Sequence, residues 1–240
     1  MIDMHSHILP GIDDGAQTLE DSLALARQAW QDGTTAVMLT PHAGGEIPAC
    51  LSRRSQALQT FLEAWRQEGC PLQFHLGLEC YLQDHILDDV LKYPECFCQN
   101  RRKVRLLLLE LPWKYDFRLL PDVLFQAQRR DITLILAHPE RYDGFLHQSA
   151  RLAELLERGL YLQFNADSLA GGTFRGWRQR RKILHLIAEA PSQMLLGSDA
   201  HDQHARPARL SPARSATVKS LGEAVWQQLS TGNASRLLGL

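Results

Sequence analysis

Short apolar segments alternate with amphipathic segments from one end of the chain to the other, and this alternation limits the folds that the chain can adopt. The apolar segments have the length of strands, and we expect strands at 1–5, 35–40, 72–79, 104–111, 132–137, 160–164 and 194–197. Their apolar runs are continuous, which is typical of parallel strands that helices bury on both faces. The sequence therefore predicts an α/β protein with parallel strands.

The segments between the strands predict helices. In the clearest one, Thr18 can cap the helix with Asp21 in its first turn, and Gly33 stands where the helix would end. We expect further helices at 52–68, 83–91, 121–130, 149–158, 174–189, 213–228 and 234–238. Seven strands with this rhythm fit a distorted TIM-like (β/α)7 barrel better than an open sheet, although spacing alone leaves the open sheet possible. The chain shows no linker or repeat, so residues 1–240 are expected to form a single domain.

Composition and charge argue against several classes of protein. The formal net charge of −1 gives no general affinity for nucleic acid or for anionic lipid. The longest apolar runs, such as 106–109, are too short to cross a bilayer, and the N-terminus lacks the pattern of a signal peptide. The five cysteines match no disulfide framework or zinc ribbon. We therefore expect a cytoplasmic protein that neither inserts into membranes nor binds nucleic acid.

Nearly every predicted strand is followed at its carboxyl end by a histidine or a carboxylate. In a parallel barrel these ends share one face, and such folds build their active sites there. The candidate metal ligands are His5, His7, Asp14, His42, Glu79, Glu110, His138, Asp199 and His201. Asp13 competes with Asp14, and we expect Asp14 to be the ligand while the other residue forms a turn or caps a helix.

The types of these side chains favour transition-metal ions. His5 and His7 stand two residues apart, so both can reach one ion if the extended conformation persists. Imidazoles together with carboxylates suit zinc, manganese or iron, and a tetrahedral ion takes only about four ligands. Three divalent ions would leave the cluster with a charge of about +2, which suits a phosphate dianion and the in-line displacement of a leaving group. Arg141 and Arg206 can supply the guanidinium groups that phosphate favours.

These residues lie in segments that resemble the polymerase-and-histidinol-phosphatase (PHP) superfamily. The segments are MIDMHSHILPGIDDGA at 1–16, TPH at 40–42, GLE at 77–79, LLELP at 108–112, AHPERY at 137–142 and GSDAH at 197–201. Their order along nearly the whole chain identifies the superfamily. LPGIDDGA and HPERY are most similar to its bacterial manganese-dependent protein-tyrosine phosphatases of capsule and exopolysaccharide operons.

The resemblance implies a barrel-like fold with a trinuclear site formed by the nine candidate ligands. It implies three divalent ions, with manganese favoured over iron or zinc, and phosphate held by Arg141 and Arg206. The implied activity is hydrolysis of phosphotyrosine in a protein, such as a bacterial tyrosine kinase of polysaccharide synthesis, by a metal-bound hydroxide. His201 or a metal-bound water is the candidate for assisting the leaving group. Many relatives continue the TPH segment with further histidines, whereas this chain has Ala43-Gly44-Gly45.

Other functions are also compatible with these residues. The same site is compatible with histidinol phosphate, another small phosphomonoester or a nucleic-acid phosphodiester, and a non-enzymatic metal-binding regulatory module is a further alternative. Trp113, Tyr115 and Phe117 follow the fourth strand and would favour a phenyl ring if they stack on it. His204 is within reach of the site from its loop. A locally basic run between Arg175 and Lys182 is either a solvated helix face or a docking surface for an acidic or phosphorylated partner.

Overall fold

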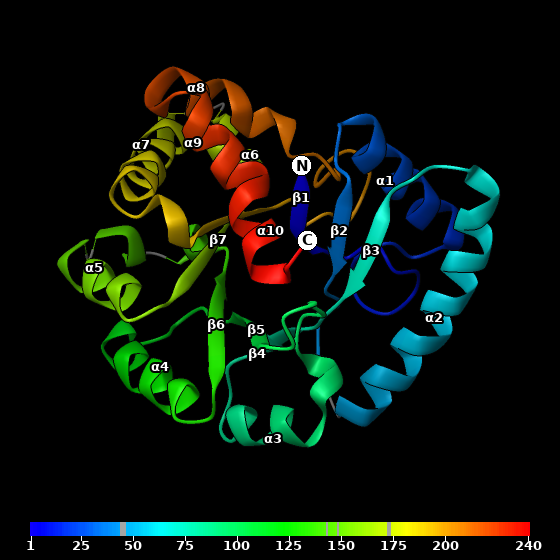
Figure 1. Ribbon diagram of the computed structural model, residues 1–240, viewed down its shortest axis with the longest axis horizontal. Helices are drawn as coiled ribbons and strands as arrows, with labels where there is room; N and C mark the ends of the chain where they lie inside the picture. Colours follow the sequence, from blue (N-terminus) through cyan, green and yellow to red (C-terminus); the bar gives the residue numbers. More distant parts are fainter. Residues whose placement is uncertain (44–46, 143, 148, 172–173) are drawn as a thin grey trace.

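A computed structural model describes residues 1–43, 47–142, 144–147, 149–171 and 174–240. Its strands are all parallel and form two sheets, with neighbours in chain order (Figure 1). The first sheet contains β1 (Ile2–Ser6), β2 (Ala36–Leu39) and β3 (Gln73–Leu76). The second contains β4 (Glu79–Tyr81), β5 (Arg105–Glu110), β6 (Ile132–Ala137), β7 (Tyr161–Asn165) and β8 (Met194–Gly197). The predicted α/β fold with parallel strands is confirmed.

Backbone hydrogen bonds connect the two sheets at their carboxyl ends. The Asp199 N–H donates to the His5 carbonyl (2.8 Å), and the His7 N–H donates to the Ala200 carbonyl (3.0 Å). On the other side, His42 and Glu79 form an isolated parallel bridge. The carboxyl ends of the first and last strands therefore lie side by side, and the residues that follow them meet.

The expected strand at 72–79 is wrong as a single element, because it is divided between β3 and β4. The division falls at Gly77, whose N–H donates to the Leu39 carbonyl and whose own carbonyl accepts from the buried Arg54. A Cβ atom on Gly77 would lie 3.0 Å from Cys98 Sγ, so this close crossing favours glycine. Consequently Glu79 begins β4 instead of ending the third strand.

The helices surround the strands (Figure 1). They are α1 (Leu19–Gln31), α2 (Ile47–Glu68), α3 (Ile86–Lys92), α4 (Leu120–Gln128), α5 (Ser149–Glu157), α6 (Ala166–Ala170), α7 (Phe174–Glu189), α8 (Arg214–Leu221), α9 (Glu223–Gln227) and α10 (Asn233–Leu238). The predicted cap of α1 is confirmed, since Thr18 and Asp21 form a capping box. The expected helix at 213–228 is wrong as one element: it is interrupted at Gly222, which has a φ of 90°.

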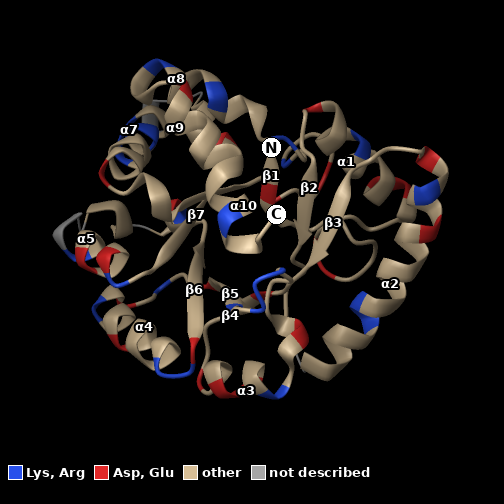
Figure 2. Cartoon of the chain, viewed as in Figure 1, with Lys and Arg blue, Asp and Glu red and all other residues tan. Residues whose placement is uncertain are grey.

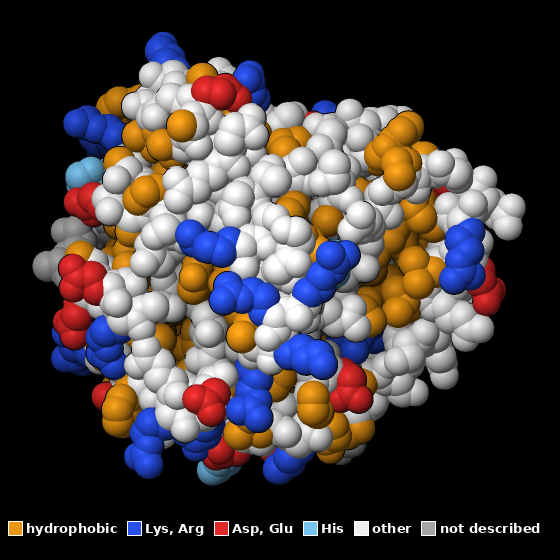
Figure 3. Space-filling model, viewed as in Figure 1, with side chains coloured by type: hydrophobic (Ala, Val, Ile, Leu, Met, Phe, Trp, Pro, Cys, Tyr) orange, Lys and Arg blue, Asp and Glu red, His pale blue; other side chains and the backbone are white. Residues whose placement is uncertain are grey.

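One end of the strand bundle is filled by α10. Its Leu237 and Leu238 pack with Ile2 and Met4 of β1 in a buried apolar cluster, and both chain termini lie at this end (Figure 1). Charged side chains lie mainly on the helices and loops (Figure 2). The face around α10 shows several Lys and Arg side chains, with histidine only at its margin (Figure 3). The N-terminus leads directly into β1 and the strands are parallel, so their carboxyl ends lie at the opposite end of the bundle.

None of the described helices is both long enough and apolar enough to cross a membrane. All five cysteines are free, as the sequence suggests.

Candidate metal centre

The structure brings all nine predicted ligands together at the carboxyl ends of the strands. They form four overlapping groups. Within each group, every side chain offers one nitrogen or oxygen atom, and these atoms lie within 4.8 Å of one another. These groups are His7/Asp14/His42/His201, His5/His7/Asp199, His5/Glu79/His138 and His42/Glu79/Glu110. Because several side chains belong to two groups, the arrangement suits neighbouring ions that share ligands better than one isolated ion.

The Glu79 carboxylate lies at the centre of the cluster. Its Oε2 atom is faced by His5 Nε2 at 3.1 Å, by His7 Nε2 at 3.3 Å and by His42 Nδ1 at 3.0 Å. Glu79 is 1% exposed, and Oε2 has no hydrogen-bond partner within the described part of the chain. A buried carboxylate oxygen without such a partner is costly, whereas a cation bound between it and the imidazoles would satisfy it.

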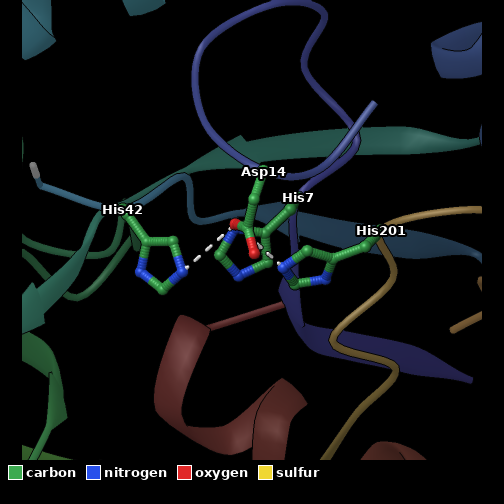
Figure 4. A group of neighbouring side chains, drawn as sticks. All are labelled: His7, Asp14, His42 and His201. Atoms are coloured by element: carbon green, nitrogen blue, oxygen red, sulfur yellow. Dashed lines mark ion pairs between the residues drawn. The ribbon is translucent and has the colours of Figure 1, made fainter. Parts of the chain in front are cut away.

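Two further carboxylates complete the cluster on either side. His138 Nε2 lies 2.9 Å from Glu79 Oε1 and 3.8 Å from Glu110 Oε1. Asp14 Oδ1 lies 3.2 Å from His201 Nε2 and 3.5 Å from His42 Nε2, with the carboxylate between the two rings (Figure 4). Asp14 is the more exposed of these carboxylates, so this part of the cluster opens towards solvent.

Local backbone geometry aims these side chains at the centre. His138 and Asp199 follow β6 and β8 with φ values of 30° and 52°, a region that residues other than glycine rarely adopt. Close approach also requires two glycines. A Cβ atom would lie 2.2 Å from the His7 carbonyl oxygen at Gly15, and 2.6 Å from His5 Cβ at Gly197. The backbone is thus locally strained at the positions that direct these side chains towards the centre of the cluster.

A chain of hydrogen bonds behind the cluster fixes the orientation of His5. Asp199 Oδ2 accepts from Asn165 Nδ2 (2.9 Å), and Asn165 Oδ1 accepts from Gln163 Nε2 (3.0 Å). Gln163 Oε1 therefore remains as the acceptor for the His138 N–H and for His5 Nδ1 (2.7 Å). With its proton on Nδ1, His5 presents the Nε2 lone pair to the centre.

His7 and His201 are oriented in the same way. His7 Nδ1 lies 2.8 Å from Asp13 Oδ2, and His201 Nδ1 lies 2.7 Å from the Asp199 carbonyl oxygen. Both rings therefore direct Nε2 inward. His5 Nε2 and His7 Nε2 are only 3.0 Å apart. Two lone pairs at this distance repel each other unless a positive charge lies between them.

The pKa directions in the cluster show how strongly its charges interact. Burial raises the pKa of Glu79, but the neighbouring histidines outweigh it and hold that pKa well below its usual range. Burial lowers the pKa of His7, yet Asp13 and Glu79 raise it to about 10. Burial together with the charge of Glu79 raises the pKa of Glu110. The buried carboxylates are thus stabilised by nearby positive charge, which either protons or metal ions can supply.

Both predicted arginines reach the cluster. Arg141, in the 3₁₀ turn η3 (Pro139–Arg141), pairs with Asp199 through Nη2. Arg206 Nη2 lies 3.4 Å from Asp14 Oδ2 and lines a cavity of about 410 Å³ with His201 and His204. Each guanidinium is partly exposed, so each can contact the cluster and a ligand entering from solvent at the same time.

The structure places the two neighbouring aspartates differently. Asp13 accepts from the Gly15 and His42 N–H groups (3.0 and 2.9 Å) and holds the His7 ring, so it supports the loop. Asp14 projects towards His42 and His201 (Figure 4). The orienting role of Asp13 is nevertheless more specific than the turn or helix cap that we expected.

Sequence reasoning missed Gln163 and Asn165. Both lie in β7, the strand that ends without a histidine or a carboxylate. Two buried amides spaced two apart in an apolar strand point to the same side, and this was the available signal. They connect His5, His138 and Asp199 without belonging to any ligand group.

The structure separates the three predicted aromatic residues. Phe117 packs against Tyr142 and Phe145, and Tyr115 lies beside Phe117. Trp113 is 71% exposed and lines a cleft with Arg141. Of the three, Trp113 therefore has the most exposed ring, and it lies beside Arg141 with its edge-on contact to Tyr142 at 6.3 Å between ring centroids. Of the Ala43-Gly44-Gly45 departure, Gly44 and Gly45 lie outside the described residues.

A parallel α/β fold with histidines and carboxylates converging at the strand ends is typical of metal-dependent hydrolases, and this chain has both features. Within that class, the chain belongs to the CpsB/CapC family of capsular polysaccharide synthesis, whose family model matches residues 1–239. The family expected from the sequence is thus confirmed.

Individual relatives agree with this assignment. The chain is 30% identical to the tyrosine-protein phosphatase YwqE of Bacillus subtilis, over 99% of this chain and 91% of YwqE. It also superposes with a TM-score of 0.84 and 28% identity on a solved structure, over 100% of this chain and 94% of the other. That structure comes from work on YwqE from Bacillus subtilis and CpsB from Streptococcus pneumoniae, which are described as unique metal-dependent tyrosine phosphatases. The lactonase Lmo2620 from Listeria monocytogenes shares the fold alone, with a TM-score of 0.62 and 11% identity over 99% and 94% of the two chains.

Proposed function

We propose that the protein is a metal-dependent protein-tyrosine phosphatase that hydrolyses phosphotyrosine in a protein substrate, with a bacterial tyrosine kinase of polysaccharide synthesis as the candidate partner. The observation that carries this proposal is the convergence of three imidazole nitrogens on the buried Glu79 Oε2. The relatives named as tyrosine-protein phosphatases supply the substrate class.

We assign the nine side chains of the cluster as ligands of three divalent ions, with manganese as the first candidate and iron or zinc as alternatives. The donor set fits these ions, because it combines imidazole nitrogen with carboxylate oxygen and contains no thiolate. When bound, such ions lower the pKa of water and neutralise the charge on phosphoryl oxygens.

The chain's own residues position the substrate. We propose that Arg141 and Arg206 hold the phosphoryl oxygens, because each guanidinium meets both the cluster and solvent and offers paired N–H donors. Trp113 offers an exposed ring beside Arg141 on which the tyrosine phenyl group can stack.

The leaving group needs little further help. The tyrosine phenolate is a fairly good leaving group, with a pKa of about 10. His201 is the candidate from the sequence for assisting it, but its Nδ1 lies 2.7 Å from the Asp199 carbonyl oxygen and its Nε2 is the proposed metal donor, so the ring has no further proton to give and we assign it as a ligand.

We further propose that the strands make up one distorted (β/α)7 barrel, with β3 and β4 as the two halves of one divided strand, and that residues 1–240 are a single domain. The hydrogen bonds between the two sheets at 2.8 and 3.0 Å support this view.

The five free cysteines agree with a reducing cytoplasm.

The proposal is tested by initial rates of protein that has been stripped with a chelator and reloaded with Mn²⁺. The substrates are a phosphotyrosine peptide, histidinol phosphate and bis-nitrophenyl phosphate, and parallel samples receive Fe²⁺ or Zn²⁺. We expect the highest kcat/KM for the phosphotyrosine peptide. A higher value for either other substrate would refute the tyrosine-phosphatase proposal while retaining a phosphoesterase, and no metal-dependent turnover would leave a metal-binding module.

A further inference from the structure

A cleft of about 550 Å³ opens beside Arg141. It lies between the η3 turn and one side of α7, and its lining residues include Trp113, Tyr142, His147, Arg178, Gln179 and Lys182. Because Arg141 also contacts Asp199 of the ligand cluster, the cleft is continuous with the place where we position the phosphoryl group. A peptide that presents phosphotyrosine to Arg141 must therefore pass close to this cleft.

The position of α7 relative to Arg141 is fixed by a hydrogen bond. Gln179 Nε2 donates to the Glu140 carbonyl oxygen at 2.6 Å, one residue before Arg141. This contact holds one side of α7 against the turn that carries the arginine. The cleft is thus part of the folded framework around the site and has a defined relation to it.

Cationic side chains contribute to the lining of the cleft. Arg141, Arg178 and Lys182 all line it. Within the described lining the carboxylate is that of Glu140, which is 5% exposed and whose Oε1 accepts from the Asn165 N–H at 2.8 Å. This carboxylate points into the protein and is not presented to a bound peptide.

Among the described residues, Lys182 is bound by a ring that leaves its charge available. Its Nζ atom lies 2.6 Å from Nε2 of His147. An ammonium group has no lone pair, so the imidazole must be the acceptor and therefore neutral in this contact. The histidine orients the lysine at the cleft without cancelling its charge.

From these contacts we infer that the cleft binds an acidic side chain of the substrate, located within about three residues of the phosphotyrosine, and that Lys182 is a determinant of this sequence preference. The inference rests on the proposed function and deepens it, since it names the class of peptide. A carboxylate carries the charge opposite to that of the Lys182 ammonium group. An extended peptide advances about 3.3 Å per residue, so the side chain of a residue close in sequence to the phosphotyrosine reaches the cleft.

The test compares kcat/KM for three phosphotyrosine peptides that differ only in their flanking residues, which are Glu, Ser or Lys. Because exposed ion pairs are weak, we expect the Mn²⁺-loaded protein to favour the Glu peptide over the Lys peptide by roughly threefold to tenfold at low salt. At an ionic strength of about 0.5 M this ratio should fall towards one, since salt screens exposed charges.

Charge reversal supplies the matched control. Lys182→Glu should invert the Glu/Lys ratio, whereas Arg181→Glu makes the same change of net charge one residue away and should retain the preference. Arg181 lies outside the cleft lining, with its guanidinium 5.9 Å from the centre of the Trp177 ring. Circular dichroism of both variants is the check that each is folded.

The outcomes separate this inference from the function on which it rests. A Glu/Lys ratio near one in the unmodified protein, or equal shifts of the ratio in both variants, would overturn the inference while phosphotyrosine hydrolysis stands. Absence of metal-dependent turnover of every phosphotyrosine peptide would overturn both.

Discussion

The ligand cluster and the cleft beside it are neighbours, yet they are built in opposite ways. In the cluster, His5 and Glu79 are almost completely buried, and the hydrogen bond that His5 Nδ1 donates to Gln163 Oε1 fixes the orientation of the His5 ring. In the cleft, Trp113 is 71% exposed and Lys182 contacts a neutral imidazole. Preorganised buried charges stabilise a transition state strongly, whereas exposed charges contribute little each. We therefore expect substitutions in the cluster to abolish turnover and substitutions in the cleft to change substrate choice.

The largest effect is expected for His5→Ala. This change removes a proposed ligand shared by two groups and leaves the Glu79 carboxylate with one fewer partner. Because metal ions contribute several kcal/mol of transition-state stabilisation, kcat/KM for a phosphotyrosine peptide should fall by about 10³-fold or more. His185→Ala is the control, since its ring is on α7 and pairs with Glu189 at 3.2 Å. A loss below tenfold in His5→Ala would contradict a catalytic cluster.

Arg141→Ala should have the next largest effect. Loss of a charged donor that meets the transferred group costs on the order of 10²-fold in turnover. Arg141→Lys retains the charge but loses the fork of paired donors, so its activity should lie between those of the alanine variant and the unmodified protein. Equal activity of the lysine variant and the unmodified protein would show that charge alone matters at this position.

Gln163→Leu tests the residues behind the ligands. The substitution removes the acceptor of His5 Nδ1 and of the His138 N–H while retaining a similar volume. Partners of metal ligands typically account for about 10- to 100-fold in metal affinity or activity. We expect the Mn²⁺ concentration for half-maximal activity to rise within that range. Gln193→Leu is the control, because Gln193 lies directly before β8, in the turn Pro191–Gln193, and its Oε1 accepts from Ser192 Oγ. An unchanged Mn²⁺ requirement would show that the ligands do not depend on this chain of amides.

Trp113→Ala should have the smallest effect of the four. An aromatic contact contributes about 0.5–1.5 kcal/mol, so kcat/KM for a phosphotyrosine peptide should fall by roughly threefold to tenfold. Activity on a phosphoserine peptide should change less, because no phenyl ring is lost from that contact. Trp177→Ala is matched to it as another exposed tryptophan. Equal losses on both peptides would argue against stacking on the phenyl ring.

The clustering of the nine side chains could be predicted because one rule places them. The carboxyl ends of parallel strands share a face, so a histidine or carboxylate after each strand is expected in one cluster even when the strands are far apart in sequence. His5 and His201 illustrate this, since they lie at opposite ends of the chain and share the cluster. Errors in strand boundaries did not matter, because a ligand needs only to follow its strand.

Other features depend on contacts that the sequence does not reveal. Gly77 sits in a run that resembles one strand, and neither its close approach to Cys98 nor the hydrogen bond from Arg54 to its carbonyl is visible in the sequence. Gln163 and Asn165 resemble any polar residues of a strand until the ligands that they orient are in place. The cleft depends on α7 packing beside the η3 turn through Gln179, a contact between residues separated by 39 positions.

The central claim is that the strand-end cluster is a centre of several metal ions. Its most direct test is an anomalous difference map at the manganese edge from a crystal of the Mn²⁺-loaded protein. We predict three peaks within the cluster, among the nine side chains that surround Glu79. A single peak, or peaks that lie outside the cluster, would contradict the account.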